Sequence, residues 1–162
     1  MQNARMTARQ FLTDVVHPNV SDFHSRYDDV RFAYNAISAV DALAAHLFEW
    51  VAANNPSAVT GIPDDTVYRG ALAARDQGFA LLRDIAKAQK HVRLTKGSPQ
   101  VSQASQITAR PIGFGLGGFG QGRYGGPPQV VVDITPTHFE YVESVVDNAL
   151  AFLEAEMTAL GA

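Results

Sequence analysis

Apolar residues recur at alternating intervals of three and four within residues 21–54. This spacing places them on one face of an α-helix, as a stripe wide enough to pack against a core. Ser21 or Asp22 can cap the first turn of such a helix. We therefore expect one long helix from about residue 21 to residue 54. Its stripe consists of Val30, Ala33, Ile37, Val40, Ala44 and Leu47.

Three further segments carry a helical pattern. The first is expected to end at His17-Pro18, because proline disfavours the helical conformation in the residue before it. The second can be capped by Asp64 or Asp65, and it is followed by Gly97 and then a proline. The predicted helices cover about residues 4–16, 66–94 and 135–160.

A glycine-rich stretch precedes the last predicted helix. Eight of the fourteen residues in 113–126 are glycine, and Phe114, Phe119 and Tyr124 are interleaved at intervals of five. The stretch lacks the Lys-Ser/Thr ending of a nucleotide-binding loop. A β-branched strand, 129–134, follows it, and a weaker extended segment precedes it, so we expect a β-hairpin. Its tip could pack on a partner subunit or stack on single-stranded RNA.

These patterns predict a mainly α fold in a single domain, residues 1–162. The expected architecture is a four-helix up-and-down bundle with two long helices and a small glycine-rich β-hairpin inserted at about 101–134. A helix of thirty residues spans about 45 Å and needs neighbours along its whole length, which favours a homodimer. Phe114, Phe119 and Tyr124 are the candidate interface residues.

Composition removes several classes of protein. The chain has no cysteine, which excludes disulfides and thiolate metal sites. Its formal net charge of −3 argues against a generally basic nucleic-acid binder. We see no secretory signal and no apolar run of eighteen residues, so we expect a cytoplasmic protein with no membrane partner.

Charge is unevenly placed along the chain. Residues 83–96 hold five lysines and arginines against the single acid Asp84, whereas residues 129–162 hold six acids and no lysine or arginine. On a helical wheel, Arg83, Lys87, Lys90 and His91 fall within an arc of about 100°. Cations beside an imidazole suit phosphodiester chemistry, by neutralising phosphate and by moving a proton. Alternatively, the basic and acidic stripes of these helices simply face each other or share solvent.

Asp41 falls on the apolar side of its predicted helix, where an unpaired carboxylate would be costly. Arg75 or Arg83 could pair with it, either as a structural ion pair or as an arrangement that orients Arg83 or His91 for catalysis. His24 and Asp28 are one turn apart, as helix-borne metal ligands often are. Because Arg31 lies in the same polar stripe, we expect a solvated face, with no metal and no cofactor.

Residues 81–94, LLRDIAKAQKHVRL, look like an Arg-Asp…Lys-His signature of uncharacterised bacterial helical proteins. With the preceding predicted helix, they resemble the HEPN-like superfamily. The resemblance covers about residues 20–95. It implies a compact helical bundle, usually dimeric, and in many members a metal-independent ribonuclease. The family pairs an arginine with a histidine and has four to six residues between them; seven residues lie between Arg83 and His91 here.

Two functions follow as expectations. The first is an interaction or structural module that dimerises and performs no catalysis. The second is a HEPN-like ribonuclease or RNA-binding protein. In that case Arg83, His91 and Asp41 would be catalytic, and Lys87 and Lys90 would bind phosphate.

Overall fold

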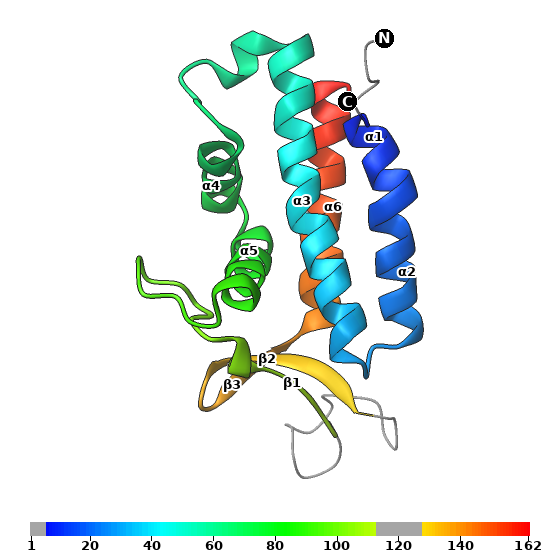
Figure 1. The fold of residues 1–162 in the computed structure, drawn as a ribbon, viewed down its shortest axis with the longest axis vertical. Coiled ribbons are helices and arrows are strands. Elements are labelled where there is room, and N and C mark those ends of the chain that lie inside the picture. The colour runs from blue at the N-terminus through cyan, green and yellow to red at the C-terminus, as the bar shows by residue number, and fades with distance from the viewer. Residues whose placement is uncertain (1–5, 113–127) are drawn as a thin grey trace.

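The computed structural model describes residues 6–112 and 128–162. Its centre is α3, which is contacted by the other long helices and by the short helix α4 (Figure 1). Figure 1 shows α1, α2 and α6 running alongside α3, with a small sheet across one end of these helices. The helices are α1 (Ala8–Phe11), α2 (His17–Ser25), α3 (Val30–Asn54), α4 (Asp65–Arg75), α5 (Gln77–His91) and α6 (Val142–Leu160).

The first helical segment does not end at Pro18, contrary to the sequence prediction. One π-helical turn, Leu12–Val16, joins α1 to α2, and Pro18 lies in the first turn of α2. A π turn shifts the hydrogen-bond pattern by one residue, which accommodates a residue without an N–H. The side-chain amide of Asn19 donates to the carbonyl oxygen of Val15 at 2.8 Å, satisfying one of the backbone acceptors there.

The long central helix begins later than Ser21 or Asp22, because its cap is Asp29. The Asp29 carboxylate accepts a hydrogen bond from the backbone N–H of Arg31 at 2.9 Å. Hydrogen bonds from the Arg31 side chain and backbone lower the pKa of Asp29 to about 2. The carboxylate is therefore negatively charged at neutral pH, and this charge interacts favourably with the positive N-terminal end of the helix dipole.

The predicted helix over 66–94 is two helices, and this is the main correction to the expected fold. Asp64 caps α4, as predicted, but Asp76 caps a new helix by accepting from the N–H of Phe79 at 2.7 Å. Next to this cap, a Cβ on Gly78 would lie 3.4 Å from the Cβ of Asn148, so glycine permits α5 and α6 to approach closely.

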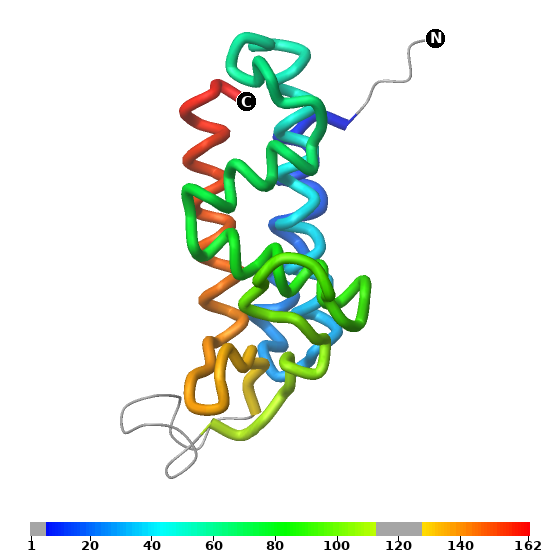
Figure 2. Tube along the Cα trace, turned by 90° about the vertical axis from the view of Figure 1, so that its left-hand side faces the viewer, coloured from blue at the N-terminus to red at the C-terminus, as the bar shows by residue number. Residues whose placement is uncertain are grey.

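The break turns α4 and α5 across the other helices. Figure 1 shows both nearly end-on while α3 and α6 stand upright, and Figure 2 shows them crossing in front of α3 and α6. A four-helix up-and-down bundle is therefore not confirmed, whereas a mainly helical fold is. Only α3 among the described helices approaches the predicted length of thirty residues, with 25.

The predicted β-hairpin is present as the antiparallel pair β1 (Ile107–Arg110) and β2 (Gln129–Thr135), with Ile107 opposite Val132. A third strand, β3 (His138–Tyr141), pairs with β2 on its other side, which gives the order β1-β2-β3. The prediction was wrong here, because it began the last helix at Thr135 or Thr137. Thr135 is the last residue of β2, Thr137 lies in the turn before β3, and α6 starts at Val142.

The core lies around α3, whose buried face meets α2, α5 and α6. By length and composition alone, α3 could also cross a membrane. More than half of its apolar window, 56%, is buried inside the fold, as is typical of the core helix of a globular domain. The largest fully buried side chains include Phe23, Phe79, Ile37, Leu43, Leu47 and Leu82.

Candidate functional site

The residues predicted to act together lie in two separate places. Arg83 and Asp41 are buried, whereas Lys87, Lys90 and His91 are exposed near the end of α5. Arg83 and His91 are eight residues apart on one helix, which corresponds to about 12 Å along its axis. The structure therefore does not bring Arg83 and His91 together in a single site.

Asp41 belongs to a buried ion cluster. Its Oδ2 lies 2.8 Å from Nη1 of Arg69, and Nη2 of Arg69 lies 2.6 Å from Asp65. The Asp41 side chain is only 5% exposed, and its Oδ1 has no hydrogen-bond partner among the described residues. The predicted partners, Arg75 and Arg83, were wrong: the ion-pair partner is Arg69.

Arg75 and Arg83 have other contacts. Arg75 lies before the break at Asp76 and pairs with Glu156 of α6 at 2.6 Å. Arg83 donates from Nη2 to the carbonyl oxygen of Thr66 at 2.9 Å, which ties α5 to the first turn of α4. Burial lowers the pKa of Arg83, and the nearby charge of Arg69 lowers it further. Arg83 thus contributes to the helix packing.

The end of α5 forms one wall of an open pocket of about 760 Å³. The other wall is the loop that follows α5. We call it the cationic pocket, because three of its lining residues carry a fixed positive charge and a fourth is a histidine. It is lined by Asp84, Lys87, His91, Arg93, Leu94, Thr95, Lys96, Gly97, Ser98 and Pro99.

A strained turn places Arg93 at this pocket. Val92 has φ 61° and ψ −45°, and the N–H of Arg93 donates to the carbonyl oxygen of His91 at 2.6 Å. These values describe a γ-turn of the rare, strained form, which is costly for a β-branched residue. Val92 is also 72% exposed. Backbone strain of this kind concentrates at functional sites.

Hydrogen bonds hold the loop against α5. The N–H of Leu94 donates to the carbonyl oxygen of Ser102 at 2.7 Å, and the N–H of Ala104 donates to that of Val92 at 3.0 Å. Asp84 accepts from the N–H of Gln100 at 2.9 Å, so the acid that lines the pocket already has a structural partner. These contacts tie the two ends of the loop to each other and hold Gln100 against α5.

The cations around the pocket differ from the other described cations in having neither an ion pair nor a side-chain hydrogen bond within the described part of the chain. They are Lys87, Lys90, Arg93 and Lys96. By contrast, carboxylates pair with Arg26, Arg31, Arg69, Arg75 and Arg110. The two remaining described arginines, Arg9 and Arg83, donate hydrogen bonds to backbone oxygens of Ala162 and Thr66.

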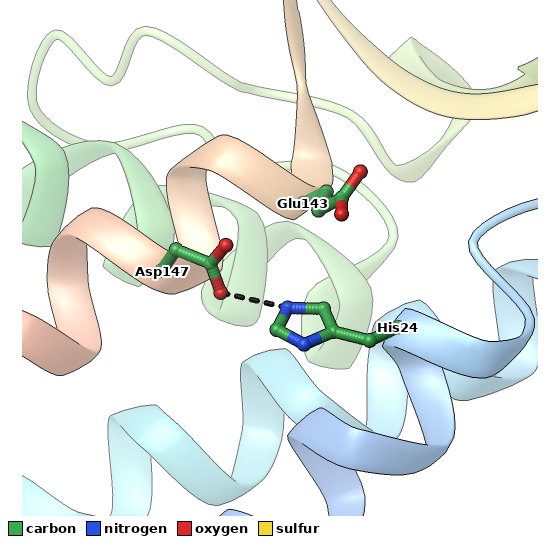
Figure 3. Close-up of side chains that lie close together, drawn as sticks. All are labelled: His24, Glu143 and Asp147. Carbon is green, nitrogen blue, oxygen red and sulfur yellow. Dashed lines mark hydrogen bonds and ion pairs between the residues drawn. The ribbon is translucent and has the colours of Figure 1, made fainter.

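The acidic face of α6 meets α2, which corrects the alternative that it faces the basic end of α5. His17 Nε2 lies 2.8 Å from Glu154, and His24 Nε2 lies 2.8 Å from Asp147. Glu143 completes a group with His24 and Asp147, whose ligand atoms all lie within 4.8 Å of one another (Figure 3). Sequence reasoning paired His24 with Asp28 and missed this group, because it depends on the packing of α2 against α6.

The candidate dimer-interface residues Phe114, Phe119 and Tyr124 lie outside the described residues, and that interface stays a prediction. Comparisons of the chain with protein-family models, with curated proteins and with solved structures give no match. The function is therefore inferred from the residues of the chain and from their geometry.

Proposed function

We propose that this protein is a binding module that holds single-stranded RNA by its phosphates at the cationic pocket. One observation carries the proposal: the four described lysine and arginine residues whose side chains have no ion pair or hydrogen bond gather at the end of α5 and in the loop after it. They are Lys87, Lys90, Arg93 and Lys96.

Unpaired cations that are held close together repel one another, and a phosphate relieves that repulsion through charge-assisted hydrogen bonds. Neutralising phosphates also releases counterions from the nucleic acid, which supplies binding free energy. The volume of about 760 Å³ lies within the range of ligand pockets. A local positive patch on a chain of net charge −3 also favours one binding surface over non-specific contact.

The placement of Lys90 favours a chain of phosphates over a single phosphate group. Lys90 lies between Lys87 and His91 in α5 but does not line the pocket, so positive charge extends around the helix to a side next to the pocket. His91 lines the pocket and could also transfer a proton. The ribonuclease alternative pairs this histidine with Arg83, and the hydrogen bond of Arg83 to Thr66 holds that arginine away from the pocket.

Binding and cleavage can be separated in one titration with a fluorescently labelled single-stranded RNA. We expect the anisotropy to rise, with the RNA intact on a gel, for both the wild type and His91→Ala. The logarithm of affinity should fall with the logarithm of salt concentration with a slope of about −2 to −3, for three or four phosphate contacts. A mononucleotide should compete only at far higher concentration.

Three results would count against this function. Absence of binding at low salt would exclude an RNA module. Cleavage by the wild type that is lost in His91→Ala would favour the ribonuclease alternative. Equal competition by a mononucleotide would identify a site for one phosphate group.

A further inference from the structure

His24, Glu143 and Asp147 form a mixed nitrogen and oxygen donor set that shares no residue with the cationic pocket. His24 lies in the last turn of α2, while Glu143 and Asp147 are one turn apart near the start of α6. Residues four apart on a helix share a face, and this face meets α2 at His24. Figure 3 shows the three side chains at the crossing of the two helices.

The charge of this group is not compensated by the described part of the chain. None of the described lysines or arginines forms an ion pair with Glu143 or Asp147, and residues 129–162 contain no lysine or arginine at all. The described ion-pair partner of this group is the His24 imidazole, whose Nε2 lies 2.8 Å from Asp147 Oδ1. A divalent cation would supply the missing positive charge.

The donor chemistry narrows the choice of cation. An imidazole nitrogen with carboxylates suits Zn²⁺ and related transition metals, whereas Mg²⁺ and Ca²⁺ prefer oxygen ligands alone. Around a tetrahedral Zn²⁺ with bonds of about 2.1 Å, ligand atoms lie about 3.4 Å apart. The three ligand atoms lie within 4.8 Å of one another. Side-chain rotations that move these atoms by about an ångström bring them to the spacing of a tetrahedral site.

We propose that His24, Glu143 and Asp147 bind one Zn²⁺-class divalent ion between α2 and α6, with a fourth position open to solvent. His24 and Asp147 are exposed and Glu143 is half-buried, so water can reach that position. Binding replaces the hydrogen bond between His24 and Asp147 with two metal bonds. It requires a neutral imidazole, so Zn²⁺ affinity falls as the pH drops. The sequence alone predicts no metal here, and the packing of α2 on α6 is what supplies the third ligand.

The same pair of helices contains a matched control. His17 lies 2.8 Å from Glu154, in the same kind of histidine–carboxylate contact, and it stands seven positions before His24 in the sequence. The described residues place no third ligand beside this pair, since the only grouping of three or more candidate ligands among them is that of His24. His17→Ala therefore removes an equivalent exposed contact without touching the proposed site.

The test is isothermal titration of the full chain with Zn²⁺, with no RNA present. We expect one ion bound per chain, about 100-fold weaker binding in His24→Ala, about tenfold weaker binding in Glu143→Gln, and unchanged binding in His17→Ala. Millimolar Mg²⁺ should not compete. Circular dichroism confirms that each variant is folded, and Asp147→Asn replaces His24→Ala if that variant is not.

Each other outcome overturns the proposal. Wild-type protein that binds no Zn²⁺ at tens of micromolar excludes the site. An equal loss in His17→Ala shows that exposed histidines bind the ion without a defined site. Competition by Mg²⁺ shows an oxygen-only site that does not use His24.

Discussion

Replacing Asp41 with alanine is expected to lower the free energy of unfolding by about 3–5 kcal/mol. The carboxylate is buried at the centre of the fold and holds Arg69 at 2.8 Å. Its removal leaves Arg69 with only Asp65, and takes away a carboxylate whose charge also stabilises the buried Arg83. Urea unfolding, monitored by circular dichroism, measures this change. The slope of the free energy of unfolding against urea concentration should stay the same.

Asp65→Ala is the matched control, because it removes the other carboxylate of Arg69 from a partly exposed position. Exposed ion pairs contribute little, so this variant should lose about 1 kcal/mol or less. Asp41→Asn retains a hydrogen-bond acceptor in a side chain of the same shape. Its loss in free energy of unfolding should lie between those of Asp41→Ala and Asp65→Ala. A loss below about 1 kcal/mol in Asp41→Ala would contradict the structural role given to this carboxylate.

Reversing two charges in the cationic pocket, Lys87→Glu with Lys96→Glu, is expected to weaken RNA binding by about 100-fold. Each lysine is assigned one phosphate, and each reversal replaces an attraction with a repulsion worth about tenfold in affinity. The salt dependence should also become shallower, by about 0.7 for each phosphate that is no longer neutralised. Fluorescence anisotropy with the same RNA, at two or more salt concentrations, measures both effects.

Lys90→Glu is the control that distinguishes an effect of the pocket position from an effect of the overall charge of the protein. It changes the net charge by the same amount as either pocket variant alone and lies on the same helix as Lys87, yet Lys90 does not line the pocket. We expect a loss of about threefold for Lys90→Glu, against about tenfold for Lys87→Glu or Lys96→Glu alone. Equal losses in all three single variants would mean that bulk charge, and not the pocket, governs binding.

The helical wheel predicted one part of the candidate site because that part lies within a single unbroken helix. Arg83, Lys87, Lys90 and His91 all follow the cap at Asp76, so their spacing on α5 is that of a regular helix. Of the predicted cationic face, Lys87, Lys90 and His91 are exposed at the end of α5, whereas Arg83 is buried. Arg93 and Lys96 belong to the same basic run, although no local pattern assigns them to the pocket.

The helical-wheel prediction was wrong on the N-terminal side of Asp76, because it assumed one continuous helix through that residue. It places Arg75 on the apolar side of the predicted helix, but Arg75 belongs to α4, whose direction differs from that of α5. An aspartate within an amphipathic segment is compatible with a solvent-exposed position in one continuous helix, and equally with the N-cap of a second helix. Only the tertiary contacts decide between them, and here the close approach of Gly78 to α6 favours the cap.

Contacts between distant segments could not be read from the sequence at all. Residues 24 and 147 meet because α2 packs on α6, and no local signal specifies that register. The pocket loop likewise depends on the γ-turn at Val92, a conformation that its residue type disfavours. By contrast, the strand at 129–134 was predictable, since its β-branched residues and flanking prolines are adjacent in sequence.

The most direct test of the cationic pocket is a titration of ¹⁵N-labelled protein with single-stranded RNA, followed by backbone amide chemical shifts. The largest shift changes should fall in residues 84–99, which hold the end of α5 and the loop that closes the pocket. Saturable changes there, weakened by added salt, are the predicted result. Unchanged amides in residues 84–99, while RNA binds and shifts other parts of the chain, would contradict RNA binding at this pocket.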